Sequence, residues 1–487
     1  MLFNSVMFIT IFLPLALVGW FLLQKLKNPV YARIFLVGMS FWFYGYYNIS
    51  YLWILLASLF FNYCISALLE KCGGHKGRKW LATGGILGNL GLLFYFKYFN
   101  FFIDNCNFFL HTNISLEKIA LPLGISFFTF QQISFLIERY RRDAAHYSFV
   151  DYAFFVSFFP QLVAGPIVLH SELIPQLQSE KVRRFSAEGF YDGLTLFILG
   201  LGKKVLLADS LAVLVNAEYA NIAALDSVSA WIVIIWYMLE LYFDFSGYCD
   251  MARGIAKMFG FWLPENFDSP FRAVSVRDFW RRWHMTLSRF LSQYVYIPLG
   301  GNRKGKIRQC LNLLIVFFVS GLWHGANWTF VVWGLMHGGA AAFEALFPKA
   351  RFPREWMNRL ATALFVTLSF SVFRSDSLEM AALLWQKLFT AGNQGMFLGI
   401  CNTLNFPENY AVLKLLGEAP PQFVNAVYLF CMFLLSGLSI YFLQGSKAEQ
   451  WIEKKGHTTT GLFCLATVFT WSFISLSQIS VFLYFNF

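Results

Sequence analysis

The stretch CLNLLIVFFVSGLWHGANWTFVVWGLM, from Cys310 to Met336, contains no Asp, Glu, Lys or Arg. A membrane-spanning helix needs about 20 mostly apolar residues, and this stretch is longer. Comparable apolar windows recur along the chain, at Ser5–Leu23, Leu52–Leu69, Ile119–Ile137, Ala230–Phe245, Ala361–Phe373, Phe423–Leu443 and Leu462–Phe485. The sequence therefore predicts an all-α polytopic membrane protein with roughly ten to twelve transmembrane helices.

The composition supports the same class. Of the 487 residues, 57% are hydrophobic, 20% aromatic and only 13% charged, whereas soluble domains average about 25% charged residues. No linker is long or polar enough to separate soluble domains, so we predict one integral membrane domain over residues 1–487. We divide it into N-terminal spans (1–115), a core (116–345) and C-terminal spans (346–487). The first span lacks the basic segment and cleavage site of a signal peptide, so we expect it to remain as an anchor.

The net charge of +11 first of all reports topology, because basic loops of membrane proteins stay in the cytoplasm. Three such loops are KCGGHKGRK (Lys71–Lys79), GKK (Gly202–Lys204) and the Arg272–Arg308 stretch, and we assign most of the basic loops to the cytoplasmic side. The eight cysteines are scattered without a CxxC pair, which argues against a disulfide framework and against a metal site. The segment GGILGNLG (Gly84–Gly91) is typical of a close helix-packing face.

Polar residues enter the apolar runs between about residues 121 and 339. Buried polar groups in lipid are costly unless they are paired, so this concentration indicates either a tightly paired core or a functional site. These residues are Gln131, Gln132, Glu138, Gln161, Glu240, Asp244, Asp250, His284, His324, Asn327 and His337.

His324 lies within an apolar segment, directly after Trp323. At helical spacing Ser320, Asn327 and Trp328 share its face. A neutral imidazole held by a neighbouring amide or hydroxyl is suited to take a proton from a hydroxyl or thiol. The alternative is a structural histidine bonded to a carbonyl of another helix, and the spacing alone leaves both possibilities open.

The segment FWRRWHMTLSRF (Phe279–Phe290) reads as an amphipathic, arginine-rich helix at the membrane surface or partly re-entrant. On a helix, His284 shares a face with Arg277, Arg281 or Trp280, and Ser288, while a second face carries Arg282 and Arg289. The loop YVYIPLGGNRKGK that follows is long enough to fold His284 toward His324. The arginines either anchor the chain at lipid headgroups or dock a polyanionic cytosolic substrate, together with Arg303 and Lys304.

The segment YFDFSGYCDMARG (Tyr242–Gly254) places Asp244 and Asp250 at the end of an apolar span. We expect these carboxylates to pair with the arginines rather than to act in catalysis. Metal binding is not expected, because no HExxH motif or Cys/His spacing is present.

Several blocks together resemble the alginate O-acetylase-like branch of the membrane-bound O-acyltransferase superfamily. The resemblance covers nearly the whole chain and is densest from Leu121 to His337. The blocks are MLFNSVMFITIFLPL, LPLGISFFTFQQISFLIERYR, PQLVAGPI, YFDFSGYCDMARGIAKMFGFWLPENFDSPF, FWRRWHMTLSRFL, YVYIPLGGNRKGK, GLWHGANWTFVVWGLMHG and the closing FLYFNF.

The resemblance implies a multi-helix membrane enzyme, with re-entrant or interfacial helices around a central funnel or tunnel and with residues 116–345 as the catalytic core. The family's catalytic histidine in the WHG block corresponds to His324, and a second one in the RWHMTLS block corresponds to His284. His337 also matches a family position, and Asn327, Ser320, Trp323 and Asp244 are possible supporting residues. We expect no bound cofactor.

The same resemblance implies that the donor is acetyl-CoA, reached from the cytoplasm of a bacterium across its inner membrane. Acetyl is then expected to pass through a partner acetyltransferase to an extracytoplasmic polysaccharide. The donor phosphates are expected to bind Arg281, Arg282, Arg289, Arg303 and Lys304. Which polysaccharide is acetylated stays open.

Two alternatives remain at this point. A sister branch of the superfamily transfers D-alanyl groups from a carrier protein to teichoic acids. A transporter would also place His, Asp and Glu inside the membrane, although the chain shows no internal repeat.

Overall fold

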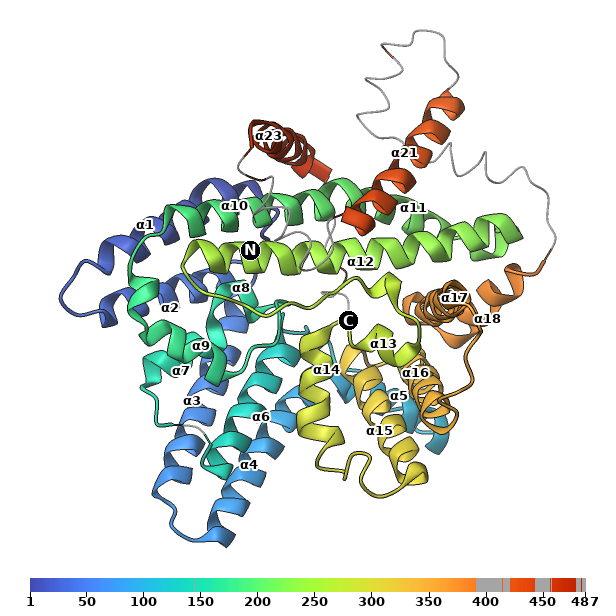
Figure 1. Ribbon diagram of the computed structural model, residues 1–487. Coiled ribbons are helices and arrows are strands. Elements are labelled where there is room, and N and C mark those ends of the chain that lie inside the picture. The colour runs from blue at the N-terminus through green and yellow to red at the C-terminus, as the bar shows by residue number, and fades with distance from the viewer. Residues whose placement is uncertain are drawn as a thin grey trace. The chain divides into compact units, whose positions relative to one another are not determined.

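A computed structural model describes residues 1–143, 145–390, 421–442 and 458–478, together with the single positions 414, 456 and 483. Every regular element within these ranges is a helix (Figure 1), and Phe267 and Trp283 form an isolated β-bridge. The predicted all-α class is therefore confirmed. Apart from Leu483, the closing block FLYFNF lies outside the described residues.

Six helical stretches of the described chain are long and apolar enough to cross a membrane. They are Ile49–Lys71, His75–Leu110, Ser227–Met258, Lys306–His324, Glu355–Arg374 and Phe423–Ile440. Three shorter apolar helices, Phe8–Leu23, Val30–Gly45 and Thr459–Ile474, add to them. The chain is thus a multi-pass membrane protein, while the total of ten to twelve spans and the central funnel stay predictions.

The described chain forms two compact units that are interleaved in sequence. The first unit contains Met1–Gly200 and Tyr248–Glu265, and the second contains Leu201–Gly247 and the described residues from Asn266 onward. Helix α12 (Ser227–Met258) contributes residues to both units. The division of one domain into parts 1–115, 116–345 and 346–487 stays a prediction.

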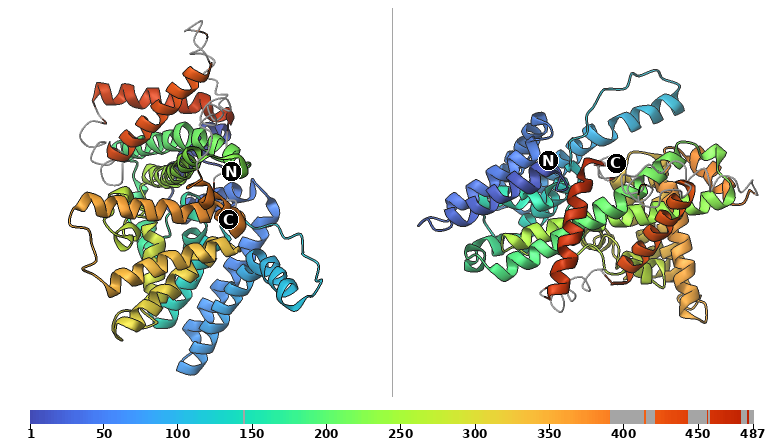
Figure 2. Two further views of the ribbon diagram at one scale, coloured as in Figure 1. Left: turned by 90° about the vertical axis from the view of Figure 1, so that its right-hand side faces the viewer. Right: turned by 90° about the horizontal axis from the view of Figure 1, so that it is seen from above.

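The first unit holds most of the N-terminal helices. They are α1 (Leu13–Leu23), α2 (Val30–Gly45), α3 (Ile49–Lys71), α4 (His75–Leu93), α5 (Phe99–Leu110), α6 (Ile125–Arg141), α7 (Phe149–Ser157), α8 (Phe159–Leu162), α9 (His170–Gln178) and α10 (Ala187–Gly202), whose last two residues belong to the second unit. A long loop, residues 111–124, joins α5 to α6 (Figure 2).

Helices α3, α4 and α6 pack closely through small residues and paired amides. A Cβ atom at Gly85 of α4 would lie 2.7 Å from Leu136 Cδ1 of α6, so the predicted packing face of GGILGNLG is confirmed. On α6, Gln132 Oε1 accepts hydrogen bonds from Ser58 Oγ and Asn62 Nδ2 of α3, each at 2.7 Å. Part of the polar concentration in the core is therefore structural pairing.

The second unit holds the candidate site. Its elements are the π-helix η4 (Lys203–Ala208), α11 (Asp209–Tyr219), the first part of α12, α13 (Val276–Trp280), α14 (Met285–Leu291), the π-helix η7 (Ser292–Tyr296), α15 (Lys306–His324), α16 (Trp328–Leu346), α17 (Glu355–Arg374), α18 (Leu378–Lys387), α21 (Pro421–Phe442) and α23 (Thr459–Ile474).

Helices α15 and α16 form a tight hairpin and lie side by side in both figures (Figures 1 and 2). Two glycines allow the close approach: a Cβ at Gly321 would lie 2.3 Å from Phe330 O, and a Cβ at Gly334 would lie 2.3 Å from Phe317 O. Any side chain at either position would force the backbones apart. The hairpin therefore fixes the end of α15, where His324 lies.

Candidate functional site

Two buried histidines of the second unit face one another. The rings of His284 and His324 lie 6.4 Å apart, centroid to centroid, at an interplanar angle of 63°. The exposed fraction is 0% for His284 and 4% for His324. The structure thus brings together the two histidines that the sequence places in separate segments.

Aromatic rings surround this histidine pair. Phe245 of α12 lies 4.8 Å from the His284 ring, and Trp323 lies 5.9 Å from it. On the other side, Trp333 and Phe373 lie 5.1 and 5.3 Å from the His324 ring. Burial lowers the pKa of His284 to about 3, so its imidazole is neutral at ordinary pH.

The predicted continuous helix through FWRRWHMTLSRF is wrong. Helix α13 ends at Trp280 and α14 begins at Met285, and His284 between them has the left-handed conformation φ 45°, ψ 52°. Few non-glycine residues adopt this conformation. Since the helix is interrupted, His284 does not share a helical face with Arg281 and Ser288.

The prediction that Asn327 and Trp328 share a helical face with His324 is also wrong. Helix α15 ends at His324, Gly325 is extended, and Asn327 is the N-cap of α16. The Asn327 side chain accepts from Thr329 N at 3.0 Å and donates to Asp376 O at 2.8 Å, which makes it a capping residue. Ser320 remains on α15 with His324 and is buried.

His337 of α16 is held at both ring nitrogens. Trp280 Nε1 donates to Nδ1 at 3.1 Å, and the Ser369 hydroxyl lies 2.8 Å from Nε2. Because Ser369 Oγ itself donates to Val366 O, it accepts the proton of Nε2. These contacts describe a structural histidine, separated from His324 by the ring of Trp333.

The expectation that Asp244 pairs with the arginines is wrong. Asp244 Oδ1 lies 2.6 Å from Lys204 Nζ, and Oδ2 accepts from Leu483 N at 2.9 Å. Lys204 also pairs with Asp209 at 2.6 Å, and the three side chains are 3% to 7% exposed. Lys203 and Lys204 of the GKK segment were predicted to lie in a basic loop, but both are buried in η4.

Asp250 belongs to the first unit, where its carboxylate lies 3.9 Å from Arg253. Of the FWRRWH arginines that the sequence suggested as its partners, Arg282 lies 3.1 Å from Asp278 instead. Among the described residues, no group of three or more His, Cys, Asp or Glu side chains is arranged to hold a metal ion.

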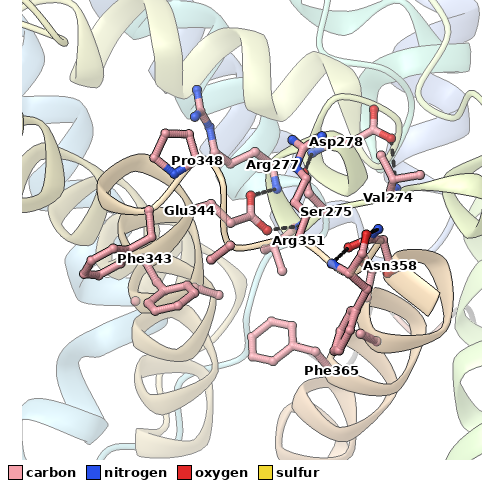
Figure 3. Close-up of a pocket in the computed structure, with 18 of the residues that line it drawn as sticks. Val274, Ser275, Arg277, Asp278, Phe343, Glu344, Pro348, Arg351, Asn358 and Phe365 are labelled. Atoms are coloured by element: carbon pink, nitrogen blue, oxygen red, sulfur yellow. Dashed lines mark hydrogen bonds between the residues drawn. The ribbon is translucent and has the colours of Figure 1, made fainter. Parts of the chain in front are cut away.

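Arginines line a cavity of about 980 Å³ between α13, the end of α16 and the start of α17 (Figure 3). Arg277, Arg281, Arg282 and Arg351 line it together with apolar side chains such as Phe343. Arg282 is paired with Asp278 at 3.1 Å. Arg289, Arg303 and Lys304 do not belong to the lining.

Glu344 of α16 fixes the edge of this cavity. Its carboxylate accepts from the backbone N–H groups of Val276, at 2.6 Å, and Arg277, at 3.1 Å (Figure 3). These are first-turn donors of α13, which otherwise lack partners. The contact therefore holds the arginine-bearing helix against α16.

A second cavity, of about 250 Å³, shares Arg277 and Arg281 with the first. Its other wall includes Phe317 and Ser320 of α15. Ser320 lies one helical turn before His324. Space lined by guanidinium groups thus reaches to within one turn of the histidine pair.

Several residues that shape this site were not predicted from the sequence: Lys204, Glu344 and Ser369. A signal existed for Lys204, because two lysines within an apolar run indicate buried pairing as readily as a loop. The partners of Glu344 and Ser369 lie 67 and 32 residues away in sequence, so no local pattern could indicate them.

Comparison with known proteins agrees with this architecture. The pattern of the membrane-bound O-acyltransferase family, MBOAT, matches residues 37–373. The chain is 37% identical to the peptidoglycan O-acetyltransferase of Helicobacter pylori, over 100% of this chain and 98% of that protein. It is 38% identical to a probable alginate O-acetylase of Azotobacter vinelandii, over 81% and 79%, and 26% identical to the teichoic acid D-alanyltransferase of Bacillus subtilis, over 51% and 65%. The chain therefore belongs to the membrane-bound O-acyltransferase family, in its alginate O-acetylase-like branch, and is an O-acyltransferase.

Proposed function

We propose that this enzyme transfers acetyl groups from cytosolic acetyl-CoA to hydroxyl groups of an extracytoplasmic polysaccharide, through a partner acetyltransferase. Its relatives named peptidoglycan O-acetyltransferase and alginate O-acetylase support both the acetyl group and the polysaccharide. The peptidoglycan enzyme matches over the full chain, which favours a cell-wall glycan over alginate. These relatives are bacterial, so we place the protein in a bacterial cytoplasmic membrane.

The observation that carries the proposal is the pair of buried histidines inside an aromatic enclosure. Acetyl transfer needs a base for the acceptor hydroxyl, a donor for the developing oxyanion, and a site without water that would hydrolyse the thioester. His324 and His284, whose ring centroids lie 6.4 Å apart, provide two imidazoles that can act on one reacting carbonyl. The surrounding Phe245, Trp333 and Phe373 exclude water.

In the proposed step, His324 takes the proton of the acceptor hydroxyl, and the hydroxyl oxygen attacks the thioester carbonyl carbon. An N–H of His284 donates to the oxyanion of the tetrahedral intermediate. The C–S bond then breaks, and the proton on His324 passes to the departing sulfur, which leaves as the coenzyme A thiol. A positioned base contributes about 10² to 10⁴-fold to such a step.

The arginine-lined cavity is the proposed entry of the donor. Coenzyme A carries phosphates at one end and a narrow thiol arm at the other. Guanidinium groups of Arg277, Arg281 and Arg351 suit the phosphates, and the smaller cavity leads from Arg281 toward Ser320. This selects Arg281 from the five basic residues that the sequence suggested, with Arg282 already held by Asp278.

The test is acetyl transfer in membrane vesicles supplied with labelled acetyl-CoA and the candidate partner. We expect His324→Ala to lower kcat by about 10²-fold or more, and Arg281→Ala mainly to raise KM for acetyl-CoA. Matched controls are His75→Ala and Arg308→Ala, since both side chains are exposed and lie outside the two cavities.

Normal transfer by His324→Ala at matched expression would remove this residue from the mechanism. The second candidate, D-alanyl transfer, is favoured by the match to a teichoic acid D-alanyltransferase over half of the chain. D-alanyl transfer would be indicated if the vesicles transferred no acetyl group from acetyl-CoA but transferred D-alanine from a D-alanyl carrier protein.

A further inference from the structure

Helix α14 begins without a cap of its own. Its N-cap residue is His284, which is left-handed and makes no side-chain cap hydrogen bond. Helices usually satisfy their first N–H groups through a Ser, Thr, Asp or Asn at this position. The first N–H groups of α14 therefore require acceptors from another segment.

Asn266 supplies these acceptors. Its backbone oxygen accepts from Met285 N at 3.0 Å. Its side-chain Oδ1 accepts from Thr286 N at 3.2 Å and from Thr286 Oγ1 at 2.6 Å. Asn266 and Thr286 are 1% and 2% exposed, so water does not compete for these hydrogen bonds.

The same segment also holds the residues before His284. Asp268 N donates to Arg282 O at 2.9 Å, and Phe267 forms an antiparallel bridge with Trp283. The backbone is thus tied to residues 266–268 on both sides of His284. A left-handed residue other than glycine persists only where its surroundings determine it in this way.

The left-handed conformation has a consequence for the site. Had α13 continued through His284, the imidazole would follow the face of Arg281. Instead the His284 ring contacts Phe245, Trp323 and His324, while Arg281 lines the cavities. The turn therefore directs His284 toward the proposed reacting carbonyl and leaves Arg281 at the cavities, where it suits the donor phosphates.

We propose that Asn266 is a positioning residue of the transfer reaction, which holds the backbone of His284 so that its imidazole faces His324. This inference rests on the proposed function, because it requires His284 to take part in the transfer. Asn266 acts through Thr286 and Met285, so its loss displaces the imidazole without removing it.

The test uses a pair of variants at Thr286. Thr286→Val removes the hydroxyl that donates to Asn266 Oδ1 at nearly constant volume, whereas Thr286→Ser keeps it. We expect Thr286→Val and Asn266→Ala to lower kcat roughly 10²-fold, because a displacement of about 1 Å costs that much. KM for acetyl-CoA should stay unchanged, since the lost interaction serves only the transition state, and Thr286→Ser should retain activity.

Asn312→Ala is the matched control. Asn312 is also fully buried in the second unit, but its Nδ2 donates to Leu299 O and Gly301 O, away from the histidines. This variant should lose thermal stability and keep kcat. All variants are measured as full-length protein in lipid nanodiscs, with the apparent Tm recorded beside the kinetics.

Equal kcat for Thr286→Val and Thr286→Ser would overturn the positioning role, as would an equal loss in Asn312→Ala. If Asn266→Ala fails to fold, the Thr286 pair alone decides. A wild-type protein that does not use acetyl-CoA would overturn the proposed function, and the positioning role would fall with it. That outcome is recognised without any variant.

Discussion

Replacement of Lys204 by methionine should destabilise the protein more than replacement of any exposed lysine. Lys204 lies between Asp209 and Asp244, at 2.6 Å from each carboxylate. Burial alone would lower the pKa of Lys204, but Asp244 and Asp209 outweigh it and raise this pKa, so the lysine is charged. Lys204→Met removes the cation that contacts both carboxylates.

The magnitude follows from the burial of all three groups. Removing one member of a buried ion pair costs about 3–5 kcal/mol, because the remaining charge stays in a medium of low dielectric constant. At about 2 °C per kcal/mol, appropriate to a large protein, the apparent Tm should fall by roughly 6–10 °C. Lys257→Met is the control: its side chain is 41% exposed and pairs with Asp192 at 3.0 Å, and such pairs contribute about 0–1 kcal/mol.

Thermal unfolding in detergent, followed by the monodisperse fraction that survives heating, measures the difference. Adding Asp209→Asn and Asp244→Asn to Lys204→Met should recover most of the loss, because the asparagines are uncharged and Asn at position 244 still accepts from Leu483 N. A Lys204→Met variant as stable as Lys257→Met would refute the reasoning, and would mean that water reaches these carboxylates.

The remaining predictions concern the hairpin and the histidine pair. Gly334→Ala places a Cβ 2.3 Å from Phe317 O and should cost about 1–3 kcal/mol, whereas Gly339→Ala on the same helix meets no atom within 4 Å and should leave the apparent Tm unchanged. The pKa of His284 is about 3, against 6.5 for an ordinary histidine, so between these values the unfolded chain binds more protons and stability should rise with pH. His284→Gln should flatten the rise of the apparent Tm between pH 4 and 6.5; an unchanged slope would show that His284 is solvated.

The class of the protein was predictable because its signal is local. A run of apolar residues such as Cys310–Met336 must be helical in a membrane, since a helix satisfies all its backbone hydrogen bonds internally. What the run did not indicate is the break within it: α15 ends at His324 and α16 starts at Trp328. Close packing of Gly321 and Gly334 across the hairpin compensates for the break, and that contact joins residues of two helices.

Side-chain direction at the candidate site was less predictable. A continuous right-handed helix would place His284 on the same face as Arg281. The segment RRWH contains no glycine, and although histidine adopts the left-handed conformation more often than most other residues, its presence alone does not predict that conformation. The conformation comes from Asn266, which lies beyond the reach of any periodic pattern.

The ion pairs of the second unit explain why several arginines gather at one cavity of an otherwise apolar chain. Asp244 is neutralised by Lys204, and Asp278 by Arg282. The carboxylate of Glu344 is occupied by backbone N–H groups. In the described part of the chain, Arg277, Arg281 and Arg351 are left without an ion pair, and all three line the same cavity. All three side chains are exposed at this cavity, so their charges are accessible to a phosphate-bearing donor and would bind it through charge-assisted hydrogen bonds.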